Sequence, residues 1–180
     1  CNLREDHEGV YKFVLDVARK LKSASVDCLV HCANTLHQYA DRIVEEVKLP
    51  IIHIADATAV EIKKQGLSKI GLLGTKFTME MDFYTKRLSE AGINSIVPEK
   101  LERLFIHNTI MNELLKEIYK PESKKRFLEI INDLEQKGAQ GIVLGCTEIP
   151  LLIKQSDTHL PVFNTLKIHA KAAVDFAVKE

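Results

Sequence analysis

Two segments of the sequence end in side chains that could move a proton. Residues 27–35 (DCLVHCANT) and 140–148 (QGIVLGCTE) each run from an apolar stretch through small residues into a turn that carries a hydroxyl group. Aligning the two segments puts Ala33 opposite Cys146 and Asn34 opposite Thr147. A pair of such turns facing one cleft could act on both faces of a planar carbanion.

Cys146 is the residue in these segments best suited to take up a proton. A thiol has an ordinary pKa of ~8.5, so only a small fraction is thiolate at neutral pH. At the N-terminus of a helix that pKa can fall by one to several units, which would make Cys146 a plausible base. A buried, inert cysteine explains the spacing equally well.

The elements that would position these turns alternate along the chain. Helical spacing of apolar residues predicts helices at about 10–21, 36–47, 55–65, 77–91, 100–119, 122–137 and 165–178. Apolar runs predict strands at 26–32, 51–54, 69–74, 93–97, 141–145 and 162–163. Strands that alternate with helices in this way indicate a parallel sheet with helices on both faces, so the expected fold class is α/β.

Polar residues follow five of the predicted strands, at the ends where ligands collect in parallel sheets. These clusters are Asn34-Thr35, Asp56 to Thr58, Thr75 to Thr78, Cys146 to Glu148, and Asn164-Thr165. The same residue types are preferred helix N-caps in any protein, so each cluster taken singly also has a purely structural explanation.

The composition excludes several classes of partner. The 180 residues contain 25 basic and 25 acidic side chains and the pI is near 7.2, which argues against nucleic-acid binding. No apolar stretch approaches the ~20 residues that span a bilayer, and residues 1–20 do not form a signal peptide. We expect a cytoplasmic protein that binds neither nucleic acid nor membranes.

The four cysteines (Cys1, Cys28, Cys32 and Cys146) are too sparse for a disulfide framework. Cys28-Leu-Val-His-Cys32 superficially suggests a metal clip. Because it lies in an apolar run that fits a strand, we expect buried thiols and no metal. A redox or zinc module is the alternative, which a metal analysis would decide.

Several motifs together resemble the aspartate/glutamate racemase family over essentially the whole chain. They are Gly145-Cys146-Thr147-Glu148-Ile149, Ala33-Asn34-Thr35-Leu36-His37, Gly71-Leu-Leu-Gly-Thr75 with Thr78-Met79, and Val162-Phe163-Asn164-Thr165 with His169-Ala170. The resemblance implies two similar α/β domains with the active site in the cleft between them. It also implies racemisation of an amino acid by a pair of acid/base thiols, without pyridoxal phosphate or any other cofactor.

The resemblance also implies roles for individual residues. Those implied to hold the carboxylate and amine of the substrate are Asn34, Thr35, Thr75 and Thr147, supported by Glu148. Lys116 could reach the substrate, given its spacing before the Gly-Cys-Thr-Glu motif, but a solvated helix lysine is nearly as good an explanation. His37 and His169 lie beside motif residues, where packing or capping is the better explanation.

Two features depart from the family pattern. The pattern usually places a cysteine directly before Asn-Thr, whereas Ala33 holds that position and Cys32 stands one residue earlier, where strand alternation points it the other way. Because an alanine carries no proton, Cys146 is expected to be the surviving thiol and Ala33 to mark the missing second base. Family members also begin with a glycine-rich strand and helix that this chain lacks. Since the chain begins at Cys1 without an initiator Met, we expect residues to precede it.

These observations lead to one predicted function and two alternatives. We expect residues 1–54 and 162–180 to form the first domain and residues 55–161 the second. The predicted function is amino-acid racemisation, with aspartate or glutamate as substrate and with Lys116, Arg87 and Arg103 as candidate partners for an acidic side chain. The alternatives are a decarboxylase or isomerase that uses one thiol, and a non-catalytic amino-acid-binding protein. The resemblance also favours a homodimer.

Overall fold

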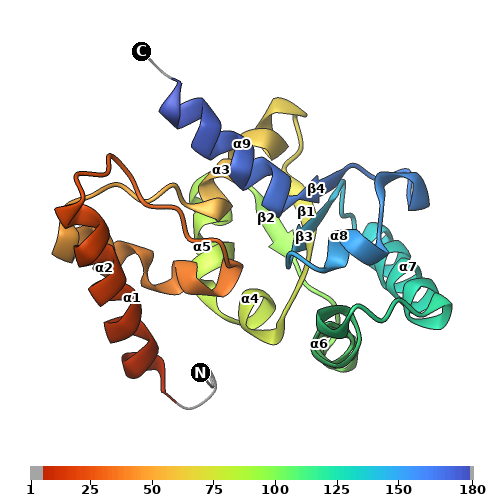
Figure 1. Ribbon diagram of the computed structural model, residues 1–180. Helices are drawn as coiled ribbons and strands as arrows, with labels where there is room; N and C mark the ends of the chain where they lie inside the picture. The colour runs from red at the N-terminus through yellow and green to blue at the C-terminus, as the bar shows by residue number, and fades with distance from the viewer. Residues whose placement is uncertain (1–5, 179–180) are drawn as a thin grey trace.

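A parallel sheet forms the centre of the molecule in the computed structural model, which describes residues 6–178 (Figure 1). Its strands, in the order β2-β1-β3-β4, are β2 (Asn94–Ile96), β1 (Lys69–Gly74), β3 (Ile142–Gly145) and β4 (Val162–Asn164). The register pairs Gly74 with Gly145, so the two central strands end side by side. The α/β fold class is confirmed.

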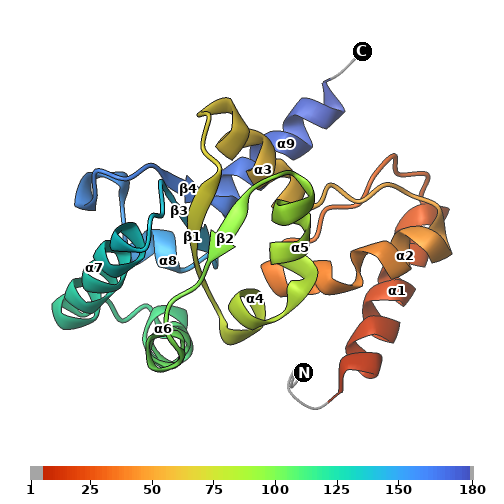
Figure 2. The ribbon, with the colours of Figure 1, turned by 180° about the vertical axis from the view of Figure 1, so that it is seen from behind.

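Helices cover both faces of this sheet because the strand residues alternate in direction. Leu73 and Leu144 pack against one layer, which consists of α6 (Lys100–Asn112), α7 (Pro121–Gln136) and α8 (Ile149–Leu152). Leu72 and Val143 pack against the other, which consists of α3 (Ile54–Lys64), α5 (Asp82–Glu90) and α9 (Thr165–Ala177). Figure 2 shows the two layers from behind.

A third apolar cluster lies to one side of the sheet (Figure 1). It joins α1 (His7–Ser23), the 3-10 helix η1 (Asn34–Tyr39) and α2 (Ala40–Val47). The predicted first helix is confirmed, and it buries Val10, Leu15 and Ala18 on one face. Its N-terminus is capped by Asp6, whose carboxylate accepts a hydrogen bond from the Gly9 amide at 2.7 Å.

The strands predicted at 26–32 and 51–54 are wrong. These segments form a single parallel bridge between Leu29 and Ile51. Leu29 donates its amide to the Pro50 carbonyl at 2.9 Å, and the Ile52 amide donates to the Leu29 carbonyl at 3.0 Å. Because an isolated pair of strands is marginally stable, the pairing goes no further.

Two predicted helices are interrupted. The helix predicted at 77–91 is split into α4 (Lys76–Glu80) and α5 by extended backbone at Met81. The helix predicted at 100–119 ends at Asn112 and is followed by the 3-10 turn η2 (Leu114–Lys116), beyond which Glu117 has a left-handed φ of 58°. A further 3-10 turn, η3, spans Gln155–Asp157.

The C-terminal segment packs on the sheet that residues 55–161 build. Strand β4 pairs with β3, and α9 packs beside α3. The division into domains at residues 54 and 161 stays a prediction.

Glycines at the ends of β1 and β3 let a side chain from α4 pack over both strands. A Cβ atom on Gly145 would lie 3.0 Å from the Leu73 carbonyl oxygen and 3.0 Å from Cγ2 of Thr78. A Cβ atom on Gly74 would lie 3.1 Å from the Gly145 carbonyl oxygen. Both distances are tighter than ordinary van der Waals contact, so glycine at these positions allows the compact strand ends that support the site below.

Candidate functional site

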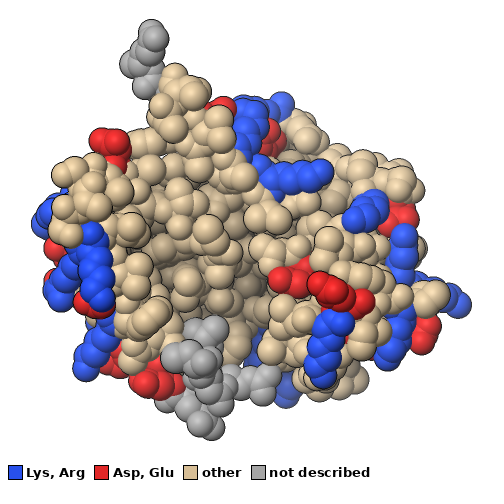
Figure 3. Space-filling view, viewed as in Figure 1, with Lys and Arg blue, Asp and Glu red and all other residues tan. Residues whose placement is uncertain are grey.

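A cavity of 180 Å³ lies at the carboxyl ends of β1 and β3, where it also meets η1. It is lined by Ala33, Asn34, Thr35, Thr75, Thr78, Ile110, Met111, Leu115, Gly145, Cys146, Thr147 and Glu148. All the predicted site residues except Lys116 therefore line one cavity. In the space-filling view of Figure 3 the centre of the molecule is hollowed, with charged side chains mostly on its flanks.

Each polar segment reaches the cavity from a turn. Ala33 has extended backbone (φ −142°, ψ 131°) and directly precedes η1. Thr75 follows β1 and caps α4, with its hydroxyl accepting a hydrogen bond from the Thr78 amide at 3.4 Å. Cys146 and Thr147 form the turn between β3 and α8.

The thiol of Cys146 is bonded to a carboxylate. Its Sγ donates to Oε2 of Glu148 at 2.9 Å, and the Thr147 hydroxyl donates to Oε1 of the same carboxylate at 2.6 Å. Cys146 is 8% exposed, and burial raises its pKa far above the ordinary value, with the Glu148 carboxylate adding to the rise. The expectation of a lowered thiol pKa is therefore wrong, because the effect of burial outweighs that of the position at the turn into α8.

Asn34 is connected to the sheet through the hydroxyl group of Thr165, which also bonds to β3. Its Nδ2 donates to the Thr165 hydroxyl at 3.5 Å, and Thr165 donates in turn to the Leu144 carbonyl at 2.8 Å. The Oδ1 atom of Asn34 is buried and has no hydrogen-bond partner within residues 6–178. It can accept a hydrogen bond from a ligand.

The three basic residues considered for an acidic substrate lie elsewhere. Lys116 is exposed on η2 and does not line the cavity. Arg87 is paired with Asp41 and, at 2.7 Å, with Asp56. Arg103 donates to Glu80 at 3.0 Å and to the Pro98 carbonyl at 2.7 Å.

Neither Cys28 nor Cys32 is fully buried. Cys28 is half-buried and Cys32 is exposed, with its Sγ 4.0 Å from the Val30 carbonyl oxygen. The expected burial of both thiols is therefore wrong, because the segment lacks the neighbouring strand that would cover it. Within the described part of the chain no three His, Cys, Asp or Glu side chains stand close enough to hold a metal ion.

Four buried histidines surround the turn that carries Ala33. The ring of His37 contacts those of His31, His53 and His169 edge-on, with centroids 5.3, 4.6 and 5.2 Å away. His37 Nδ1 donates to the Ala33 carbonyl at 3.1 Å, and His169 Nε2 donates to the Ile52 carbonyl at 2.6 Å. The cluster thus links η1 to α3 and α9.

Burial keeps these imidazoles neutral. It lowers the pKa of His37 to about 3, and the neighbouring His31 contributes to this lowering. It lowers the pKa of His53 to about 2, to which the neighbouring His37 also contributes. Burial also lowers the pKa of His31 and of His169. The neutral rings are the form that packs edge to face in this apolar junction.

We expect the protein to lose stability as the pH falls below ~6.5, the pKa of an unfolded histidine. Since each folded-state pKa is lower than this, the unfolded chain binds more protons below that pH, and the stability present above it is lost. His37 and His53 should each cost about 1 kcal/mol of unfolding free energy between pH 6.5 and 5.5. Urea unfolding at a series of pH values measures this.

His37→Gln should flatten this dependence, because it removes one of the buried imidazoles that must be protonated on unfolding. An unfolding free energy that stays constant from pH 7 to 5.5 would show that the buried rings do not resist protonation.

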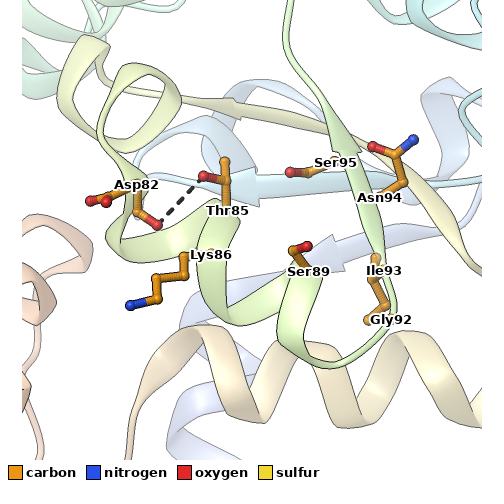
Figure 4. A pocket seen from close by; sticks show the side chains of 8 residues that line it. All are labelled: Asp82, Thr85, Lys86, Ser89, Gly92, Ile93, Asn94 and Ser95. Carbon is orange, nitrogen blue, oxygen red and sulfur yellow. Dashed lines mark hydrogen bonds between the residues drawn. The ribbon is translucent and has the colours of Figure 1, made fainter.

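A larger hollow lies on the far edge of the sheet, between α5 and β2 (Figure 4). Its 570 Å³ are bordered by short polar residues, among them Thr85, whose hydroxyl donates to the Asp82 carbonyl at 3.5 Å. None of the predicted site residues reaches it.

Comparison with known proteins gives a family match over most of the chain. The family model described as Asp/Glu/Hydantoin racemase matches residues 2–173. The broad specificity amino-acid racemase RacX of Bacillus subtilis (strain 168) is 25% identical over 172 residues, covering 94% of this chain and 73% of that protein. A glutamate racemase of Persephonella marina is 29% identical over 91% of this chain but 63% of its own length.

Solved structures agree with this match. A Yersinia pestis protein provisionally described as an Asp/Glu racemase superposes with a TM-score of 0.92 at 44% identity, over 97% of this chain and 76% of that one. An aspartate racemase homologue from Pyrococcus horikoshii gives a TM-score of 0.87 at 37% identity, over 98% and 77%. The chain thus spans roughly two thirds to three quarters of the length of these relatives. Within residues 6–178, no helix has the length and apolar character needed to cross a membrane.

Proposed function

Because this chain belongs to the Asp/Glu/Hydantoin racemase family, we propose that it removes and returns the Cα proton of an amino acid, with Cys146 as the group that carries the proton. The observation that carries the proposal is the short contact between the Cys146 thiol and the Glu148 carboxylate inside the cavity. No pyridoxal phosphate takes part in the proposed reaction.

Glu148 supplies the acceptor that a protonated thiol needs before it can act as a base. The thiol proton passes to Oε2 of Glu148 over 2.9 Å, which leaves a thiolate and a carboxylic acid. The thiolate then takes the Cα proton, and the electron pair left on the substrate is shared with its own carboxylate. The Cys146 thiol then returns a proton to Cα, and the proton held by Glu148 passes back to the thiolate, which restores the starting state.

The polar side chains around the cavity are suited to hold the rest of the substrate. We propose that the hydroxyls of Thr35, Thr75 and Thr147 donate to the substrate carboxylate, where negative charge grows in the transition state. The unpartnered Oδ1 of Asn34 can accept from the substrate ammonium group.

Ala33 favours a second candidate function. Its methyl group lines the cavity where the second base is expected, and it cannot carry a proton. With one thiol, proton removal and return occur on the same face of Cα, so exchange proceeds with retention. A single-thiol isomerase or decarboxylase on this scaffold would use the same Cys146–Glu148 pair.

Solvent exchange tests the proposal. The intact protein is incubated in D₂O with single enantiomers of a panel of amino acids, and Cα deuterium is read by mass spectrometry together with chiral chromatography. We expect label in at least one amino acid, and treatment with hydroxylamine, which removes pyridoxal phosphate, should leave the rate unchanged. Binding of amino acids without any label would contradict catalysis and indicate a binding protein.

A further inference from the structure

One wall of the cavity is apolar and comes from the segment that joins α6 to α7. Ile110, Met111 and Leu115 line it, together with the polar turns at Asn34 and Thr75. Ile110 is buried, whereas Met111 is 37% exposed and Leu115 is 51% exposed. A ligand that covered these two side chains would remove apolar surface from water, which favours binding.

This wall is held in a defined position. Leu114 is 1% exposed and anchors η2 in the core, so that its neighbour Leu115 remains at the cavity. Glu113, at the end of α6, accepts a hydrogen bond from the Ser123 hydroxyl at 2.7 Å and pairs with Lys120 at 3.1 Å. The turn is thereby fastened to the start of α7.

The charges around the cavity disfavour an acidic side chain on the ligand. The carboxylate of Glu148 lines it, while Arg87 and Arg103 pair with acidic residues elsewhere and Lys116 is not among the lining residues. A second carboxylate placed against Met111 and Leu115 would lose hydration, and none of the described residues that line the cavity is basic. The volume of 180 Å³ is below the ~300 Å³ at the lower end of drug-sized sites, so the ligand is small.

We propose that the apolar wall formed by Ile110, Met111 and Leu115 receives the side chain of the substrate, and that the substrate is an amino acid with an uncharged aliphatic side chain. This inference rests on the proposed function and adds the substrate class. It departs from the expectation of aspartate or glutamate.

The test compares aliphatic and acidic amino acids in the intact protein. We expect kcat/KM for Cα deuterium exchange to be at least ~10-fold higher for leucine or methionine than for aspartate or glutamate, the discrimination that one or two apolar groups provide. Leu115→Arg should lower the value for leucine by ~10-fold and raise it for glutamate, because a guanidinium then stands at the wall. Leu101→Arg is the matched control, since Leu101 is 79% exposed on α6 and does not line the cavity.

Binding of α-methyl amino acids, which have no Cα proton to lose, separates this inference from the proposed function. If α-methylleucine binds and α-methylglutamate does not, the substrate class stands even where exchange fails. Faster exchange of aspartate or glutamate, or tighter binding of α-methylglutamate, in the unaltered protein would overturn it. The inference would also be overturned if the Leu115→Arg variant showed the same preference between leucine and glutamate as the unaltered protein.

Discussion

Replacing Cys146 with alanine should lower Cα proton exchange by at least ~10²-fold, the contribution typical of a general acid/base group. Cys146 lies in the cavity with its thiol donating to Glu148, and alanine removes the group that carries the proton while Glu148 remains. The measurement is loss of the Cα proton of one enantiomer in D₂O, followed by NMR with the intact protein.

Cys28→Ala is the control for this substitution, because Cys28 is half-buried outside the cavity. It should change the exchange rate much less, and unfolding curves should show both variants folded. Equal exchange by the Cys146 variant and its parent would remove Cys146 from the mechanism.

Ala33→Cys should raise racemisation more than it raises exchange. Ala33 and Cys146 line the same cavity from different segments, so a thiol at position 33 would stand where the second proton carrier is missing. Inversion requires removal from one face of Cα and delivery to the other. Exchange that starts from the enantiomer already served by Cys146 needs only the existing thiol. Chiral chromatography and deuterium content, measured on the same samples, give both rates.

Cys32→Ala is the control for the position of the second thiol. Cys32 directly precedes Ala33 and is exposed, so it competes for the same role if the turn can bring it round. Loss of racemisation in the Cys32 variant would assign the second base to Cys32 and refute the role given to position 33. Strong racemisation by the unaltered protein that neither substitution affects would point to a residue not considered above.

Helices with a strong apolar period could be predicted from the sequence, and strands could be predicted only where the sheet supplied neighbours. Helix α1 forms where apolar spacing predicted it, although Phe13, Val17 and Leu21, which belong to that pattern, are exposed. The runs at 26–32 and 141–145 both predict strands, but only the latter lies between two partner strands. Local pattern does not contain that difference, because strand formation depends on pairing with distant segments.

The polar half of the site was predictable, and its apolar half was not. The turns at Asn34, Thr75 and Cys146 could be identified because small and hydroxyl-bearing residues follow apolar runs. Met111 and Leu115 have the spacing of ordinary core residues on a helix, so nothing in the sequence marks them as cavity-lining. The raised pKa of Cys146 was equally hidden, since it arises from burial and from a carboxylate two residues later in a turn.

The burial of Cys146 also determines what thiol-reactive reagents can report. Alkylation needs an accessible thiolate, and Cys146 is 8% exposed with its thiol bonded to Glu148, whereas Cys32 is exposed. Iodoacetamide should therefore label Cys32 well before Cys146. Inactivation by the first equivalent of reagent would then reflect a bulky adduct on Cys32, the residue before Ala33. Counting functional active sites by titration of Cys146 therefore requires a variant that lacks Cys32.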